Sequence, residues 1–242
     1  MGLDTESLAV SPQYEDANAH ASDILEPTVL ELSNQSILSA STPVYQLNGS
    51  VTTTSLKGSS IIFERINGTP NITDEAAPKS RTKHLFYLVH PLNAEYRTDV
   101  PAYYITSASG DGTTIGNIRF EVSKKSIFQK TEFKALLSPK RSASDTPLFT
   151  DAEKVLFHVQ PKWKGGRYEW VDSDRKHLAF QDSKGDQQKL IITMAMRREV
   201  RDALVALWML RIWYDTAESR QAKREGEYIA ELSLSLCRDG YY

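Results

Sequence analysis

The stretch that most constrains this chain lies near its C-terminus, at residues Arg197–Glu218. Every residue from Ala203 to Leu210 is apolar, and after Arg211 the apolar run resumes for three residues. A surface helix keeps one polar face, whereas this stretch is apolar on all sides through two turns. It is too short and too closely flanked by arginines for a membrane span, which needs about 18 apolar residues. We therefore predict a helix over 197–218 that is buried on every side, with the Arg211 charge satisfied by polar groups or at an opening.

The chain before this helix is typical of a series of short β-strands. Apolar or alternating runs such as His84–His90 and Val51–Leu56 are separated by turn residues. Gly110-Asp111-Gly112 predicts a tight hairpin between Tyr103–Ser107 and Thr114–Val122. A dozen such strands favour an antiparallel barrel, and a barrel wider than about eight strands needs something inside. The sequence therefore predicts a mainly β fold, an antiparallel barrel of about twelve strands closed around the hydrophobic C-terminal helix.

The chain divides into three predicted parts. Residues 1–27 are polar and acidic without an apolar period, which predicts a mobile acidic arm. Residues 28–218 form the predicted barrel, including its central helix over 197–218. Residues 219–242 form a charged C-terminal tail.

Charge is unevenly distributed along the chain. Residues 1–78 carry 2 basic and 10 acidic side chains, a net of −8, whereas residues 79–201 carry 22 basic and 14 acidic side chains, a net of +8. One interpretation is that each surface is simply solvated. The other is that the basic middle section meets an anionic partner, such as a membrane surface or the acidic N-terminal part of the same chain.

Two basic segments are the candidate binding site. A cationic turn that carries a tryptophan is suited to a lipid headgroup layer, which favours binding to anionic phospholipid. The alternative is that the tryptophan packs on the barrel and its neighbouring lysines are solvated. The predicted headgroup-binding residues are Lys124, Lys125, Lys130 and Lys134 in the first segment and Lys162, Trp163, Lys164 and Arg167 in the second.

Catalytic and metal-binding patterns are missing from the sequence. The five histidines include no close pair, the only cysteine is Cys237, and no G-x-S-x-G motif is present. We predict no catalytic residues, no metal, no cofactor and no enzyme activity. No nucleic-acid-binding module is recognisable, so we expect no nucleic-acid partner. With no transmembrane segment or signal peptide, we expect a cytoplasmic protein that is at most peripheral at a membrane.

Several short motifs occur in a particular order along residues 30–215. They are Ser33-Asn34-Gln35-Ser36-Ile37-Leu38-Ser39, Pro43-Val44-Tyr45, Ile115-Gly116-Asn117-Ile118, Arg167-Tyr168-Glu169-Trp170 and the Leu/Trp-rich helix Ala203 to Trp213. In this order they resemble a fungal domain-of-unknown-function family of the tubby C-terminal-like superfamily. The resemblance implies a twelve-stranded barrel around a central hydrophobic helix.

The resemblance leaves the function open. Tubby proteins bind phosphoinositide headgroups through basic residues of the barrel wall, but no tubby lipid-binding motif aligns here residue by residue. The leading hypothesis is a non-enzymatic module that binds anionic lipid. The competing hypothesis is a scaffold barrel that binds a partner protein, and a small-molecule carrier or enzyme with a pocket at the barrel mouth is a third.

Overall fold

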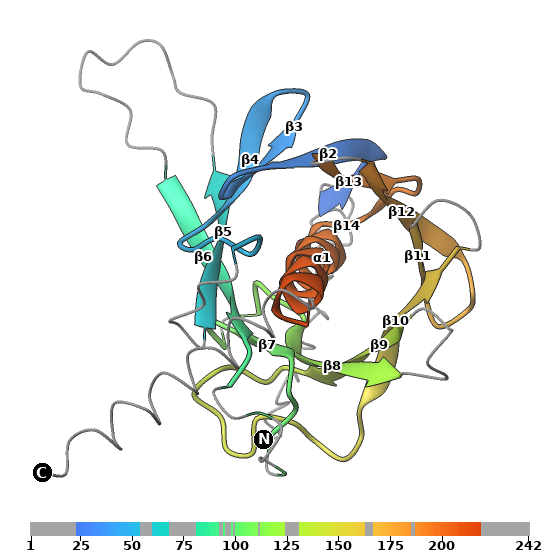
Figure 1. Cartoon of the computed structure of the whole chain (residues 1–242). Helices are drawn as coiled ribbons and strands as arrows, with labels where there is room; N and C mark the ends of the chain where they lie inside the picture. The colour runs from blue at the N-terminus through green and yellow to red at the C-terminus, as the bar shows by residue number, and fades with distance from the viewer. Residues whose placement is uncertain are drawn as a thin grey trace, which may run out of the picture.

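The computed structural model is a closed barrel of twelve antiparallel β-strands around one α-helix. Figure 1 views it along the barrel axis, with the helix in the interior. This arrangement confirms the predicted fold. The structure describes residues 23–53, 60–67, 81–91, 94, 98, 100–110, 112–123, 131–162, 167–184 and 187–218.

Each barrel strand pairs with its neighbours in the chain, which makes an up-and-down barrel. The barrel closes where the last strand meets the first, with Leu190 opposite Leu30. The twelve strands are β2 (Thr28–Ser33), β3 (Ser36–Ser39), β4 (Thr42–Leu47), β5 (Ser60–Asn67), β6 (Arg81–Val89), β7 (Tyr104–Ser107), β8 (Gly116–Ser123), β9 (Glu132–Pro139), β10 (Lys154–Pro161), β11 (Tyr168–Val171), β12 (His177–Lys184) and β13 (Gln187–Ile192).

Two short strands lie outside the barrel wall. β1 (Ile24–Leu25) pairs with β14 (Met196–Arg197), which leads directly into the helix. Residues 23–27, assigned to the N-terminal arm by sequence, therefore include a strand at the barrel end where the helix begins. Residues 1–22 and the predicted tail, 219–242, lie outside the described residues.

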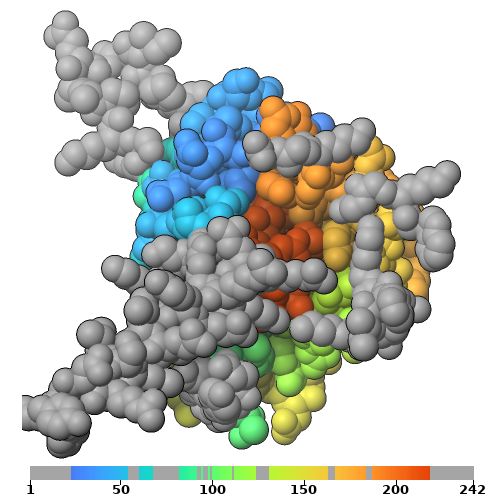
Figure 2. Space-filling model, viewed as in Figure 1, coloured from blue at the N-terminus to red at the C-terminus, as the bar shows by residue number. Residues whose placement is uncertain are grey.

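The helix α1 (Arg198–Ala217) fills the barrel, as its all-round apolar sequence requires. Every residue from Arg201 to Tyr214 is buried. Its apolar side chains pack against the inward-facing positions of the strands, which alternate with outward-facing ones. In Figure 2 the red-orange atoms of α1 are visible between the surrounding strands at the barrel end that faces the viewer.

Two local features differ from the strand predictions. β3 was not predicted as a separate strand; it forms a hairpin with β2 through a turn in which Asn34 has φ 54°. Asparagine tolerates this left-handed conformation better than most residues. The predicted strand Val51–Leu56 is wrong at residues 51–53, which are not in a strand, and its remaining residues lie outside those described.

Packing and hydrogen bonding explain why the Ile115-Gly116-Asn117-Ile118 motif has glycine and asparagine at its centre. Gly116 has φ 124°, and a Cβ there would lie 2.4 Å from the Ser138 carbonyl oxygen, so only glycine fits. The Asn117 side chain accepts a hydrogen bond from the Ser107 amide and donates to the Ser142 carbonyl oxygen and, at 2.8 Å, to the Leu148 carbonyl oxygen. Asn117 thus holds the segment after β9 against the outer barrel wall.

Candidate functional site

The strand order brings the anchors of both predicted basic segments to one end of the barrel. Ser123, at the end of β8, pairs with Glu132 at the start of β9. The backbone amide of Lys162, just after β10, donates to the Arg167 carbonyl oxygen at 2.8 Å. Because β9 and β10 are paired neighbours, the β8–β9 and β10–β11 connections start from adjacent positions on this rim.

This rim surrounds the end of α1. Tyr214, in the last turns of the helix, contacts the Phe133 ring of β9 edge-on, with 5.1 Å between ring centroids. Phe133 is the second residue of β9, next to the β8–β9 connection. We call this end of the barrel the C-terminal mouth and the opposite end, where α1 begins, the N-terminal mouth.

Three of the eight predicted headgroup-binding residues are described, and two of these lie together. Lys162 and Arg167 flank the β10–β11 connection. Lys134 lies on the wall in β9, opposite His158. His158 comes four positions before Lys162, so at ~3.3 Å per residue Lys134 is about 13 Å from Lys162 along the strand direction. The other five, Lys124, Lys125, Lys130, Trp163 and Lys164, lie outside the described residues.

Lys162 and Arg167 each form an ion pair between a half-exposed cation and a mostly buried carboxylate. Lys162 Nζ lies 3.4 Å from Glu169 Oε1 and 4.0 Å from the centre of the Phe180 ring. Arg167 Nη2 lies 3.2 Å from Asp182 Oδ2. The two basic side chains are 40% and 44% exposed. Their carboxylate partners are only 14% and 18% exposed, so an incoming phosphate would compete with Glu169 and Asp182 for the two cations.

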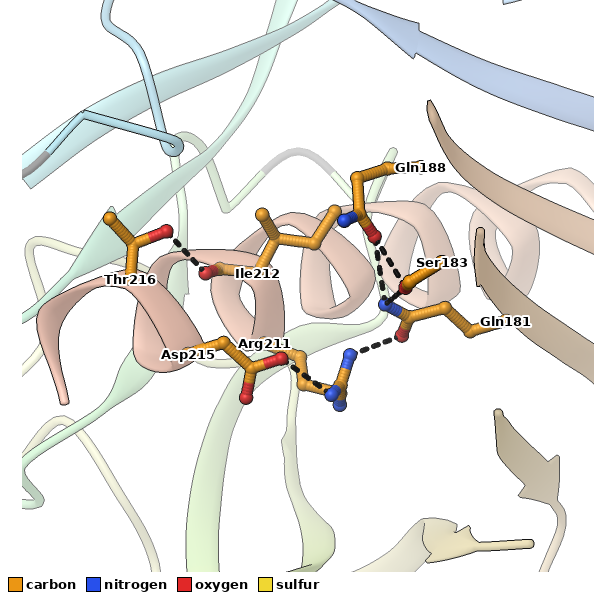
Figure 3. A network of polar contacts seen from close by, with 7 residues as sticks. All are labelled: Gln181, Ser183, Gln188, Arg211, Ile212, Asp215 and Thr216. Carbon is orange, nitrogen blue, oxygen red and sulfur yellow. Dashed lines mark hydrogen bonds and ion pairs between the residues drawn. The ribbon is translucent and has the colours of Figure 1, made fainter. Parts of the chain in front are cut away.

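A buried polar network lies behind this rim (Figure 3). Arg211 Nη1 donates to Gln181 Oε1 at 2.5 Å, and Nη2 donates to Asp215 Oδ2 at 2.6 Å. The guanidinium group also lies 3.6 Å from the centre of the Tyr168 ring. Arg211 is only 2% exposed. The Arg211 charge, in the middle of the apolar helix, therefore contacts the Asp215 carboxylate, the Gln181 amide oxygen and the Tyr168 ring. These contacts agree with the expectation that polar groups satisfy this charge.

The network continues through Ser183 and Gln188 to a cavity at the C-terminal mouth. Ser183 donates to Gln188 Oε1 at 2.7 Å, and Gln181 Nε2 lies 3.3 Å from both Ser183 Oγ and Gln188 Oε1 (Figure 3). Gln188 and Asp215 line a cavity of about 480 Å³ that also meets Thr216 of α1. The C-terminal mouth thus has the Arg211–Asp215 ion pair and polar amide and hydroxyl groups in its interior and the cations Lys162 and Arg167 on its rim.

A second buried polar cluster, at the N-terminal mouth, was not predicted from the sequence. Asp202 is fully buried, accepts a hydrogen bond from the Tyr45 hydroxyl at 2.8 Å and pairs with Arg65 Nη1 at 2.6 Å. Burial raises the pKa of Asp202, and the Arg65 charge and the Tyr45 hydrogen bond oppose that rise. Burial and the neighbouring Asp202 charge raise the pKa of Tyr45. The only sequence signal was the position of a carboxylate at the start of an apolar helix.

A wider cleft lies on the outer wall, between β8 and the segment after β9. It has a volume of about 900 Å³, and its lining includes Arg119, Phe149 and the carboxylates Asp145 and Asp151. Hydrogen bonds from Ser142 lower the pKa of Asp145. A general acid that works near neutral pH requires the opposite shift, so this carboxylate does not have the character of one.

The described residues carry neither a metal-binding cluster nor a membrane-spanning helix. Within them, no three His, Cys, Asp or Glu side chains are grouped so that they could hold a metal ion. No helix among these residues is both long and apolar enough to cross a membrane.

Comparisons with protein-family models, curated proteins and solved structures find no match for this chain. The resemblance to the tubby C-terminal-like superfamily therefore stays a prediction.

Proposed function

We propose that this barrel is a non-catalytic binding module that engages an anionic phospholipid surface through its C-terminal mouth. The observation that carries the proposal is the shared rim of the β8–β9 and β10–β11 connections, anchored at Ser123–Glu132 and Lys162–Arg167. In the sequence these two connections carry six cations, Lys124, Lys125, Lys130, Lys162, Lys164 and Arg167.

The charges are sufficient for peripheral binding. Each Lys or Arg near an anionic membrane contributes about 1 kcal/mol, and the contribution falls off within a Debye length of about 8 Å at physiological salt. The neighbouring carboxylates Glu169 and Asp182 reduce this contribution, because they already pair with Lys162 and Arg167. We therefore infer a salt-sensitive, reversible interaction. The sequence resembles the tubby C-terminal-like superfamily, and tubby proteins bind phosphoinositides. Phosphoinositide is therefore the first anionic lipid to test.

Vesicle flotation tests this proposal. At about 0.15 M salt, the full chain should float with vesicles that contain phosphoinositide and remain at the bottom with neutral vesicles. The double substitution Lys162→Glu/Arg167→Glu should weaken binding at least tenfold, because it reverses two rim charges worth about 1 kcal/mol each.

Lys154→Glu/Lys176→Glu is the matched control. Both lysines are exposed; Lys154 begins β10 and Lys176 immediately precedes β12, so each lies at the barrel end away from the rim. This control changes net charge by the same amount and should float like the wild type. Equal loss in both variants, or no flotation of the wild type with any lipid, would contradict the proposal. Capture of a protein partner that requires residues 1–78 would then favour the scaffold hypothesis.

A further inference from the structure

The N-terminal mouth contains a small cavity lined by three arginines. Its volume is about 190 Å³, and it lies between the start of α1 and strands β2 to β5. Aliphatic side chains form part of its wall, and no carboxylate lines it. Its polar lining consists of Arg65, Arg198, Arg201, Tyr45, Thr28 and Ser39.

Two of the three arginines are neutralised by carboxylates behind or beside the cavity. Arg65 pairs with the buried Asp202. Arg198 Nε pairs with Asp23, and both of these side chains are partly exposed. These two pairs contribute no net charge to the cavity.

Arg201 is the exception. It is only 7% exposed, yet no Asp or Glu among the described residues lies within ion-pair distance of it. Its Nη2 donates to the backbone carbonyl oxygens of Leu25, at 2.9 Å, and Glu26. Its Nε, like that of Arg211, is buried and has no hydrogen-bond partner among the described residues. The charges of Asp202 and Glu26 act on Arg201 only from beyond ion-pair distance. A buried guanidinium group without a contacting counter-ion is costly, so its presence points to an anion that neutralises it.

The start of α1 adds to this positive potential. The helix begins at Arg198, and no side chain in the described part of the chain caps its N-terminus. Unpaired N–H groups in the first turn carry about half a positive charge. Glu199 lies in this turn but is paired with Arg197. The cavity therefore combines one unneutralised guanidinium group with the positive end of a helix.

We propose that this cavity binds a small oxyanion of the phosphate class. Its volume is below the ~300–1,000 Å³ of pockets for drug-sized ligands, so only a small group fits. Arginine presents a planar set of donors that matches phosphate oxygens. Thr28 and Ser39, whose hydroxyl oxygens lie 2.9 Å apart, supply further donors at the wall. The site lies at the opposite barrel end from the cationic rim and does not depend on the proposed lipid-binding function.

The test compares inorganic phosphate with chloride at equal ionic strength, using calorimetric titration and thermal unfolding of the full chain. Phosphate should bind with a measurable heat and raise Tm, whereas chloride should not, because a ligand that binds only the folded state stabilises it. Arg201→Gln should weaken phosphate binding at least tenfold through the loss of a charged donor. If this variant fails to fold, Arg198→Gln serves instead, since its ion pair is partly exposed. It should also weaken phosphate binding, because it removes a donor from the lining and leaves the Asp23 charge uncompensated beside the anion.

Arg197→Gln is the matched control, because Arg197 is 60% exposed, pairs with Glu199 and does not line the cavity. It should bind phosphate like the wild type. Equal effects of phosphate and chloride, or unchanged phosphate binding in Arg201→Gln or Arg198→Gln, would overturn the proposal. Flotation with vesicles that contain phosphatidic acid distinguishes two possible ligands of the cavity, a free phosphate ion and the phosphate of a lipid headgroup. In the Lys162→Glu/Arg167→Glu background, which weakens binding through the rim, flotation that is lost on adding Arg201→Gln assigns the cavity to a phosphomonoester headgroup. Absence of flotation in that background before Arg201 is changed assigns the cavity to a free anion.

Discussion

Leu207→Asp is expected to prevent the chain from folding. Leu207 lies in the middle of α1 with no exposed surface, enclosed by the barrel wall. The substitution removes a buried side chain, at a cost of about 2–5 kcal/mol, and places an unpaired carboxylate in an apolar interior. The sum approaches or exceeds the 5–15 kcal/mol by which a typical domain is stable.

The measurement is soluble expression followed by circular dichroism and thermal unfolding. Leu207→Met is the control, because a swap that nearly conserves volume costs less than about 1.5 kcal/mol, and it should unfold cooperatively near the wild-type Tm. A soluble Leu207→Asp protein that melts like the wild type would show that α1 is not enclosed.

Asp202→Ala is expected to lower the free energy of unfolding by about 3 kcal/mol. The substitution leaves Arg65 and the Tyr45 hydroxyl without their shared acceptor inside the barrel. Removing one member of a buried ion pair typically costs 3–5 kcal/mol. We expect the lower end of this range because the Arg65 side chain is 16% exposed and can recover some hydration.

Denaturant unfolding of three variants separates this effect from a general loss of charge. Glu31→Gln breaks the exposed Lys189–Glu31 pair and should cost less than about 1 kcal/mol. The double substitution Arg65→Met/Asp202→Leu removes both charges and should recover most of the stability lost in Asp202→Ala. A double variant that is less stable than Asp202→Ala would contradict this account of the cluster.

The helix and the barrel could be predicted because each depends on a local pattern. An apolar run without a polar face can only be buried, and the predicted bounds, 197–218, differ from those of α1 by one residue at each end. β3 was not predicted as a separate strand because its sequence, Ser36-Ile37-Leu38-Ser39, has only two apolar residues between serines and so shows no strand period. Val51 is fully buried without being in a strand, so its apolar character reflects packing and not pairing.

The binding sites depend on contacts that no local pattern reveals. Lys162 and Arg167 are close in the sequence, and their position on one hairpin could be predicted. Arg65 and Asp202 are separated by 137 residues, and only closure of the barrel brings them together. The cavity at the N-terminal mouth needs β1 to β5 and α1 at once, so Arg201 could not be identified from the sequence as the arginine without a contacting carboxylate.

The central claim is that the C-terminal mouth faces an anionic membrane, and hydrogen–deuterium exchange with and without phosphoinositide vesicles tests it most directly. Bound lipid should slow amide exchange in peptides that cover residues 120–135 and 158–170, and peptides of the opposite end, around β1 and β14, should exchange at an unchanged rate. Protection confined to the N-terminal mouth, or no protection under conditions in which the protein floats, would contradict the claim.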